Sequence, residues 1–493
     1  FLIKKFRKTP IKFNELNIEA KIIYLIIIGY VLLALSPTTN ADSLDYHLGI
    51  PMYILNNEIY PNFKFWFHFA ISGSGEIFYI LSLINHAEQL PALTQISSIL
   101  SLLGIILKRT KLSENKNNYK LALIMISCPV LIFFAASAKV QLIYVAGSSL
   151  IFTLIFFSNE KEILSKNFFI FTTIILITAI SAKFSFVLSS ILLWSYIFYI
   201  SLKKKLTFHL LLISFIVFSY IFVPKITHRI DLYNLDFLQS IIFPLPINMY
   251  GYSQLYNSLT SCGYNGCFPY WLVFPKNLGT FTESLGIGSL AIFILNFKKD
   301  NKLIIILLLI SVQIIASHSF GPNNARWYLE PFMWSLITLK YYGIKNNNIE
   351  KIFYKLGFLQ SILIIAPIIY GVYSLTPGSL SENSRFKVMT KNADGYELFK
   401  WVNEIRKKDD IILSTHRSFS LGGHNVIPGD ILMYIEPNDK RAIVYFEEIK
   451  KLKPNLILFY DDKKYFKSLK NCIGKLLHFK KNVAKKASRN PFN

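Results

Sequence analysis

Long apolar runs recur along this chain and are separated by short polar segments. Apolar runs of about 17 to 25 residues are typical of membrane-spanning helices, and shorter runs can span a bilayer that thins locally. The pattern predicts an α-helical polytopic membrane protein with about eleven spans. We expect these spans at 22–36, 91–107, 120–136, 140–157, 168–182, 184–200, 206–223, 279–297, 303–317, 327–342 and 352–373.

The pattern changes after residue 373. Two short apolar runs, 410–415 and 454–460, are typical of buried strands, and helical spacing appears in 394–408 and 441–452. Two domains are therefore expected. A membrane domain would cover 1–373, and a small C-terminal α/β domain outside the membrane would cover 374–493.

The distribution of charge predicts the orientation. Lys and Arg total 53 against 29 Asp and Glu, which gives a net charge of +24. A soluble protein of this charge would be a candidate for nucleic-acid binding. Here the basic residues concentrate in alternate loops, as they do on cytoplasmic faces. We therefore expect no nucleic-acid partner, a bacterial inner-membrane location, a cytoplasmic N-terminus, and outward positions for loops 37–90 and 224–277 and for the C-terminal domain.

The second outward loop contains Cys262 and Cys267 in the segment "SCGYNGC". Two cysteines this close could form a disulfide in an oxidising compartment. A single cysteine pair at this spacing is a weak zinc signal, because no His or Cys pair accompanies it. The sequence therefore predicts a disulfide here and no zinc centre.

The segment "TTNADSLDYHLGIP", 38–51, places charged residues directly after the first apolar run. Asp42 and Asp45 are three positions apart and would share one face of a helix. Carboxylates beside a membrane bundle are costly to desolvate and often mark function. Such a group could accept a proton from a hydroxyl or bind a divalent cation. The structural alternatives are a helix cap for Asp42 and a hydrogen-bonded structural role for His47.

Three cationic residues lie at outward ends of predicted spans, namely Lys139, Lys183 and Arg326. The two lysines occupy similar segments, "AASAKVQL" and "AISAKFSF". A lipid phosphate at the bilayer surface needs cationic partners, and Arg can bind phosphate oxygens through two nitrogens. The alternatives are snorkelling of the lysines to the interface and a local ion pair between Arg326 and Glu330.

The acidic first loop resembles that of the GT-C superfamily of polytopic glycosyltransferases, in particular its mannosyl- and aminoarabinosyltransferases. Those enzymes use polyprenyl-phosphate-linked sugars as donors, and an Asp or Glu in the first outward loop is their base. Their common pattern is Asp-Glu followed by a Tyr. Asp42 and Tyr46 match it, whereas Ser43 replaces the Glu, so Asp45 is an alternative for the role.

Two further segments resemble the same superfamily. "NNARWYLEP", 323–331, is similar to an Arg-aromatic-x-x-Pro segment that opens a late span, although the proline here lies one position later. The two "SAK" junctions are similar to lysine-bearing junctions in those enzymes. The resemblance extends over about residues 20 to 375 and implies an active site on the outer face of the membrane.

The expected function is an inverting transfer of a hexose or pentose from a polyprenyl-phosphate-linked donor to a glycan, lipid or protein acceptor in the cell envelope. Asp42 or Asp45 would be the base, and the expected substrate-binding residues are Tyr46, His47, Lys139, Lys183 and Arg326. His68 and Glu76 could also line the site, with interfacial anchoring as their alternative role. The carboxylates of the first outward loop could also bind a divalent cation as a cofactor. A transporter, flippase or polymerase of lipid-linked sugars is the alternative, although a transporter would carry its charges in mid-span.

Overall fold

The structure is a computed structural model of the 493-residue chain. It describes residues 16–61, 66, 73–108, 117–158, 165–203, 207–233, 269–275, 278–296, 300–320, 324–429, 440–458 and 475–477. Cys262 and Cys267, their predicted disulfide and His68 lie outside the described residues.

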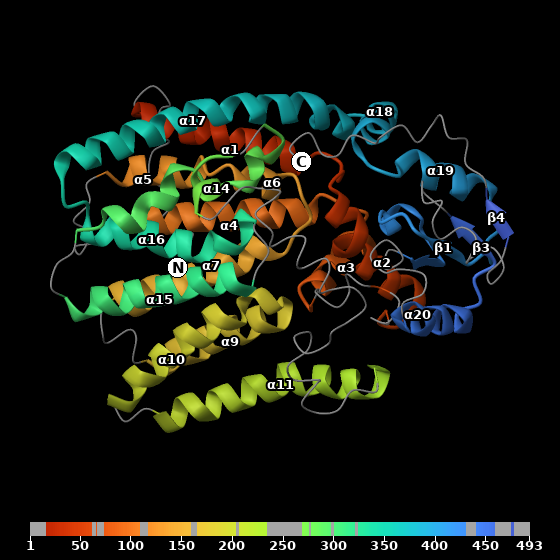
Figure 1. Ribbon diagram of the computed structural model, residues 1–493, viewed down its shortest axis with the longest axis horizontal. Helices are drawn as coiled ribbons and strands as arrows, with labels where there is room; N and C mark the ends of the chain where they lie inside the picture. The colour runs from red at the N-terminus through yellow and green to blue at the C-terminus, as the bar shows by residue number, and fades with distance from the viewer. Residues whose placement is uncertain are drawn as a thin grey trace.

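Helices of the predicted membrane region form one bundle (Figure 1). They are α1 (Ile18–Ala34), α4 (Leu90–Leu107), α5 (Asn118–Ile126), α6 (Val130–Ala135), α7 (Gln141–Phe157), α9 (Lys166–Ala182), α10 (Val187–Lys203), α11 (Thr207–Tyr233), α15 (Asn301–Phe320), α16 (Leu329–Tyr342) and α17 (Asn347–Leu375). Shorter helices are α2 (Leu48–Asn57), α3 (Ile80–Ile84) and α14 (Tyr270–Val273).

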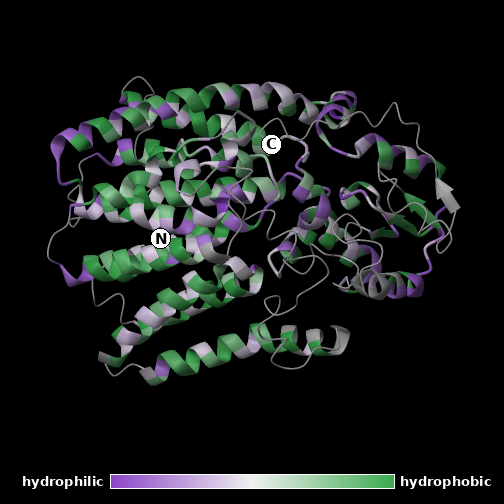
Figure 2. Cartoon of the chain, in the orientation of Figure 1, coloured by the Kyte–Doolittle hydropathy of each residue, from purple (hydrophilic) through white to green (hydrophobic). Residues whose placement is uncertain are grey.

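Three of the described helices are long and apolar enough to cross a membrane, at Leu90–Leu107, Asn301–His318 and Asn347–Ser379. Further apolar helices are shorter, and Figure 2 shows hydrophobic residues along the bundle. Large apolar side chains also remain exposed on it, with Phe215 at 69%. Because exposed side chains of this kind are favourable against lipid, the chain is an integral membrane protein. The count of eleven spans stays a prediction.

Two predicted spans were wrong in their internal structure. The segment 120–136 is not one helix, because it breaks between α5 and α6 at Pro129, whose ring cannot continue a helix. The segment 279–297 is not α-helical. It forms two 3₁₀ segments, Leu278–Glu283 and Ile287–Ile294. Gly286 directly precedes the second one, and its φ of 76° does not fit a continuous right-handed helix.

Close packing and a few polar caps hold the bundle together. Gly29 of α1 lies directly against Ile368 of α17, where a larger residue would collide. The rings of Phe152 and Trp334 stack with their centroids 5.1 Å apart, joining α7 to α16. The buried Lys340 ammonium donates to the carbonyls of Ile105 and Lys108 at 2.7 and 2.6 Å, and so caps the end of α4.

After α17 the chain forms α18 (Glu382–Asn392) and a small α/β domain. The domain contains α19 (Tyr396–Ile405), β1 (Ile412–Ser414), β2 (Val426–Pro428), α20 (Lys440–Lys451), β3 (Leu456–Leu458) and β4 (Lys475–Leu477). Its four strands form a parallel sheet in the order β2-β1-β3-β4. The predicted helices and strands of this region are confirmed.

The C-terminal domain shares a hydrophobic core with the segment that follows α1. Tyr46, Ile50 and Trp66 are buried in one cluster with Phe399 and Phe419 of the C-terminal domain. The rings of Trp66 and Phe419 meet edge to face, with centroids 5.5 Å apart. Because one core spans both parts, the segment carrying Asp42 is held by the bundle and by the C-terminal domain together (Figure 1).

Candidate functional site

Asp45 lies on a π-helical turn, Ser43–His47, between α1 and α2, and Asp42 directly precedes this turn. Asn40 anchors the turn, because its side-chain oxygen accepts bonds from the Ser43 amide at 3.1 Å and the Ser43 hydroxyl at 3.2 Å. Single π-helical turns are rare and occur frequently at functional sites. Here the turn lets Asp42 and Asp45 both contact the guanidinium of Arg417.

Asp42 is surrounded by three cationic side chains. Its Oδ2 lies 2.6 Å from Lys139 Nζ and 3.2 Å from Arg326 Nη1, and its Oδ1 lies 2.9 Å from Arg417 Nη2. The Asp42 side chain keeps 24% of its surface exposed, so the carboxylate is reachable from one side. Its surroundings are those of an anion held in a cationic cup rather than those of a helix cap, and no cap hydrogen bond from it is present among the described residues.

Lys139 is presented by the short loop between α6 and α7. The Lys139 carbonyl accepts hydrogen bonds from Tyr79 Oη, at 2.7 Å, and from Gln95 Nε2. The neighbouring Ala138 amide donates to Ser43 Oγ at 3.0 Å. These bonds fix the loop to the Asp42 turn, so the buried lysine side chain has a defined position instead of snorkelling.

Arg326 precedes α16 in a 3₁₀ turn, Ala325–Tyr328, that Asn324 caps. Arg326 forms an ion pair with Asp42, and its Nε is buried without a hydrogen-bond partner among the described residues. Glu330, the alternative partner, is buried on α16, and one of its oxygens has no hydrogen bond within the described chain. The contacts of the described residues therefore do not include an ion pair between Arg326 and Glu330.

Lys183 follows α9 and is brought to the same site by a turn at Gly73. The Ser74 amide donates to the Ser181 carbonyl at 3.1 Å, and Gly73 lies so close to the Ala182 backbone that any Cβ would collide. The Lys183 side chain is buried, and none of the described carboxylates forms an ion pair with its ammonium. It is a buried cation with spare hydrogen-bonding capacity.

His47 and Glu76 form a fully buried pair beside these cations. His47 Nδ1 lies 3.1 Å from Glu76 Oε1, and Glu76 Oε2 accepts a bond from the Gly73 amide at 3.0 Å. His47 Nε2 is buried and has no hydrogen-bond partner among the described residues. If Nδ1 carries the proton and donates to the carboxylate, Nε2 is left as an acceptor.

Arg417 joins the C-terminal domain to both aspartates. Its Nε lies 3.0 Å from Asp45 Oδ2, while its Nη2 contacts Asp42. The second Asp45 oxygen accepts from Trp66 Nε1 at 3.3 Å, and the Asp45 side chain is fully buried. Asp45 is thus held from two sides, whereas Asp42 is the partly exposed carboxylate.

Charge and burial set the protonation states. Burial raises the pKa of Asp42, but the charges of Lys139, Arg417 and Arg326 outweigh it, so its pKa lies well below the usual value. Burial lowers the pKa of Lys139 to about 7 and that of Lys183 to about 8, with Arg326 adding to both shifts. Burial also lowers the pKa of His47 to about 4, so its imidazole is neutral near pH 7.

The structure brings together every predicted site residue that it describes. Asp42, Lys139 and Arg326 are in direct contact, Asp45 joins them through Arg417, and the buried Tyr46 ring lies against that of His47, with centroids 4.0 Å apart. The sequence argument missed Arg417 and left Glu76 as a minor candidate.

A divalent cation would need free oxygen ligands. The carboxylate oxygens of Asp42 and Asp45 already accept hydrogen bonds from cationic side chains and from Trp66 Nε1. No group of three His, Cys, Asp or Glu side chains among the described residues is arranged to hold a metal ion. The donor set therefore does not fit a metal in this state.

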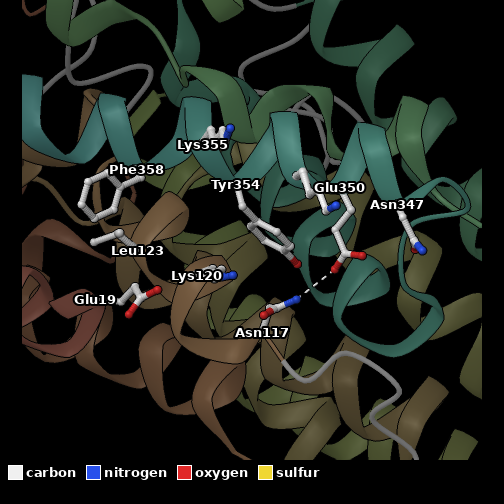
Figure 3. Close-up of a pocket in the computed structure, with 10 residues that line it drawn as sticks. Glu19, Asn117, Lys120, Leu123, Asn347, Glu350, Tyr354, Lys355 and Phe358 are labelled. Atoms are coloured by element: carbon white, nitrogen blue, oxygen red, sulfur yellow. Dashed lines mark hydrogen bonds between the residues drawn. The ribbon is translucent and has the colours of Figure 1, made fainter. Parts of the chain in front are cut away.

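A separate cavity of about 480 Å³ lies between the starts of α1, α5 and α17 (Figure 3). In it Asn117 donates to Glu350 at 2.9 Å, and Lys120 lies over the Tyr354 ring, 5.5 Å from its centroid. The Asp42 site lies beyond the other end of α1, so none of its residues lines this cavity.

The fold of this bundle and its appended α/β domain is similar to that of a solved polytopic membrane protein. A crystal structure of ArnT from Cupriavidus metallidurans bound to undecaprenyl phosphate is similar, with a TM-score of 0.54 at 12% identity, over 88% of this chain and 89% of that one. The chain belongs to the DUF1420 family: the DUF1420 N-terminal domain matches residues 1–389 and the DUF1420 C-terminal domain matches 390–493. No curated protein matches it.

Proposed function

We propose that this protein transfers a sugar from a polyprenyl-phosphate-linked donor to an acceptor at the outer face of a bacterial inner membrane. The observation that carries the proposal is the cluster of Lys139, Arg326 and Lys183 around one partly exposed carboxylate, Asp42. Such a cluster supplies both a cationic site for a phosphate group and a proton acceptor beside it. The similarity of the fold to that of ArnT, which was crystallised with undecaprenyl phosphate, supports the same function.

The phosphate of the sugar donor would bind among these cationic side chains and replace Asp42 as the partner of Lys139 and Arg326. Lys183 would donate a further hydrogen bond to this phosphate. Each cation that turns to the phosphate weakens its hold on Asp42, and the pKa of this carboxyl rises toward its ordinary range. Donor binding would thus turn a tightly paired carboxylate into a usable base.

In the transfer itself, Asp42 would accept the proton of the acceptor hydroxyl. The oxygen of this hydroxyl would attack the anomeric carbon at the same time. The bond between this carbon and the phosphate oxygen breaks, and the electron pair leaves with the lipid phosphate. The developing charge is held by Lys139, Lys183 and Arg326. One displacement inverts the anomeric centre, and Asp45, engaged by Arg417 and Trp66, would orient rather than accept the proton.

His47 and Tyr46 would complete the donor side. With Nδ1 bonded to Glu76, His47 Nε2 can accept a hydrogen bond from a hydroxyl of the bound sugar. The acceptor would be a glycan, lipid or protein of the cell envelope, approaching from the side of the C-terminal domain. A cytoplasmic N-terminus would place this domain outside the cell membrane.

Mass spectrometry of lipid-linked sugars and surface glycans tests the proposal. In cells expressing Asp42→Asn we expect the donor lipid to accumulate and one sugar to be missing from an envelope glycan, as in cells lacking the gene. An unchanged profile with Asp42→Asn and with the gene deleted would refute a transferase. Accumulation of the donor on the inner leaflet alone would favour a flippase.

A further inference from the structure

One ionic contact between the two parts of the molecule reaches into the proposed active site. Arg417 lies in the loop after β1, at the carboxyl end of a central strand. In parallel α/β sheets, the crevice at the carboxyl ends of the strands is where ligands and functional residues gather. Here this edge of the sheet faces the Asp42 turn and directs a guanidinium at two carboxylates.

Hydrogen bonds within the C-terminal domain fix the Arg417 loop. Ser414 Oγ donates to the His416 carbonyl at 3.1 Å, the Ser418 amide donates to His416 Nδ1 at 3.2 Å, and Ser418 Oγ donates to the Asp394 carbonyl at 2.7 Å. Ser420 Oγ then crosses to the Leu44 carbonyl at 2.7 Å. The loop is therefore rigid on both sides of Arg417 and is docked on the turn that carries the aspartates.

Resting on the function proposed above, we propose that Arg417 is a positioning residue through which the C-terminal domain sets the orientation and ionisation of Asp42. Its guanidinium spans Asp42 and Asp45 with two different nitrogens, 2.9 and 3.0 Å away. A planar, permanently charged fork can do this, whereas the single ammonium of a lysine cannot. The membrane domain alone would then hold an incompletely formed base.

Several charged groups act on Asp42 besides Arg417, whose guanidinium carries a permanent charge. The cations around it come from three further elements: Lys139 from the loop before α7, Lys183 from the end of α9 and Arg326 from the turn before α16. The neighbouring carboxylates are Asp45, bound to the same arginine, and Glu76, bound to His47.

Infrared titration of the purified full-length protein in detergent tests this role without any substrate. The protonated carboxyl band of Asp42 is identified as the band lost in Asp42→Asn. We expect Arg417→Gln to move the appearance of this band to higher pH by about 1 to 3 units, because a neighbouring arginine lowers a carboxyl pKa by about this much. A band that stays at its original pH would overturn the proposal.

Arg385→Gln is the matched control. Arg385 on α18 also crosses to another element, where Nη2 lies 2.6 Å from Glu88 Oε2, but it does not contact either aspartate. If Arg385→Gln moves the Asp42 band as far as Arg417→Gln does, general loosening explains the shift and the proposal fails. If Arg417→Gln does not fold, Arg417→Lys takes its place. We then expect the Asp42 band to appear at a higher pH by a smaller amount, and a band at its original pH would again overturn the proposal.

Undecaprenyl phosphate binding separates this inference from the proposed function. Arg417→Gln should leave the dissociation constant within about threefold of the wild type, because Lys139, Lys183 and Arg326 remain. Sugar transfer in membranes should fall at least tenfold, because Asp42 loses its fixed orientation and this loss outweighs the higher basicity of the carboxylate. Loss of binding in Arg417→Gln would make Arg417 a phosphate ligand and overturn the positioning role. Failure of the wild type to bind would instead count against the proposed function.

Discussion

Arg417 Nη2 lies 2.9 Å from Asp42 Oδ1, although 375 positions separate the two residues. The contact joins the family's C-terminal domain, 390–493, to the turn that follows the first helix of its N-terminal domain, 1–389. It makes the candidate site a property of both domains, because Asp45 and Trp66 are held in the same interface.

Asp42→Asn should abolish most of the transfer without weakening phosphate binding. The substitution preserves shape but removes the proton acceptor, so we expect transfer to fall by a factor on the order of 10² or more. It also removes the anion that competes for Lys139 and Arg326, so undecaprenyl phosphate should bind at least as tightly as to the wild type. Sugar transfer in membranes and ligand binding in detergent measure the two effects.

Asp45→Asn is the matched control for Asp42→Asn. Asp45 is fully buried and keeps one bond to Trp66, so its replacement should lower transfer less than Asp42→Asn does. The reverse order would make Asp45 the base. Full transfer activity in both variants would remove the first-loop mechanism and favour the transporter.

Local patterns predicted much of this architecture, because the spacing of apolar residues along the chain indicates where helices and strands form. In the C-terminal domain, α19, β1, α20 and β3 were predicted from apolar spacing, whereas α18, β2 and β4 were not. The prediction of a membrane-spanning helix at 279–297 was wrong in structure, because hydrophobicity indicates burial without fixing the type of helix. Gly286 within this run was the signal of a break. Asp42 and Arg326 were predicted from the motifs around them, whereas Arg417 stands in "STHRSFS", a polar loop without a motif. Its role depends on domain docking, and the one available signal was its place directly after a strand.

Lys183→Met should weaken phosphate binding by about 10- to 100-fold, which corresponds to one hydrogen bond between charged groups. Lys183 is buried and forms no ion pair with the described carboxylates, so its ammonium has no competing partner to leave. Binding of undecaprenyl phosphate to the purified protein measures the effect. Lys355→Met, at the cavity near the start of α17, is the control and should bind normally. Equal binding by Lys183→Met and the wild type would exclude Lys183 from the phosphate site.

Binding of a lipid phosphodiester should weaken as the pH rises from 7 to 9. The pKa of Lys139 is lowered to about 7 and that of Lys183 to about 8, chiefly by burial, so both ammonium groups lose their protons over this range. The methyl ester of undecaprenyl phosphate is a suitable probe, because its single charge does not titrate there. Lys183→Arg keeps its charge throughout and should flatten the curve. A flat curve for the wild type would contradict this assignment of the cations.

His47 should make the fold less stable as the pH falls. Burial lowers the pKa of His47 from 6.5 to about 4 in the folded protein, so between these values the unfolded chain binds a proton that the folded chain does not. The stabilisation is therefore fully present above pH 6.5 and is lost progressively as the pH falls toward 4, by up to about 3 kcal/mol. Thermal unfolding in detergent at pH 7 and pH 5 should show this loss in the wild type.

His47→Gln removes the titrating ring while keeping a side chain that can donate to Glu76. Its unfolding temperature at pH 7 should be lower, because the fit of the buried imidazole is lost, but it should fall less between pH 7 and pH 5 than that of the wild type. His209→Gln replaces an exposed histidine on α11 and should reproduce the wild-type pH dependence. If His47→Gln and the wild type lose the same stability on acidification, a group other than the His47–Glu76 pair governs the acid response. His47 then need not be neutral, as it must be to accept a hydrogen bond from the bound sugar.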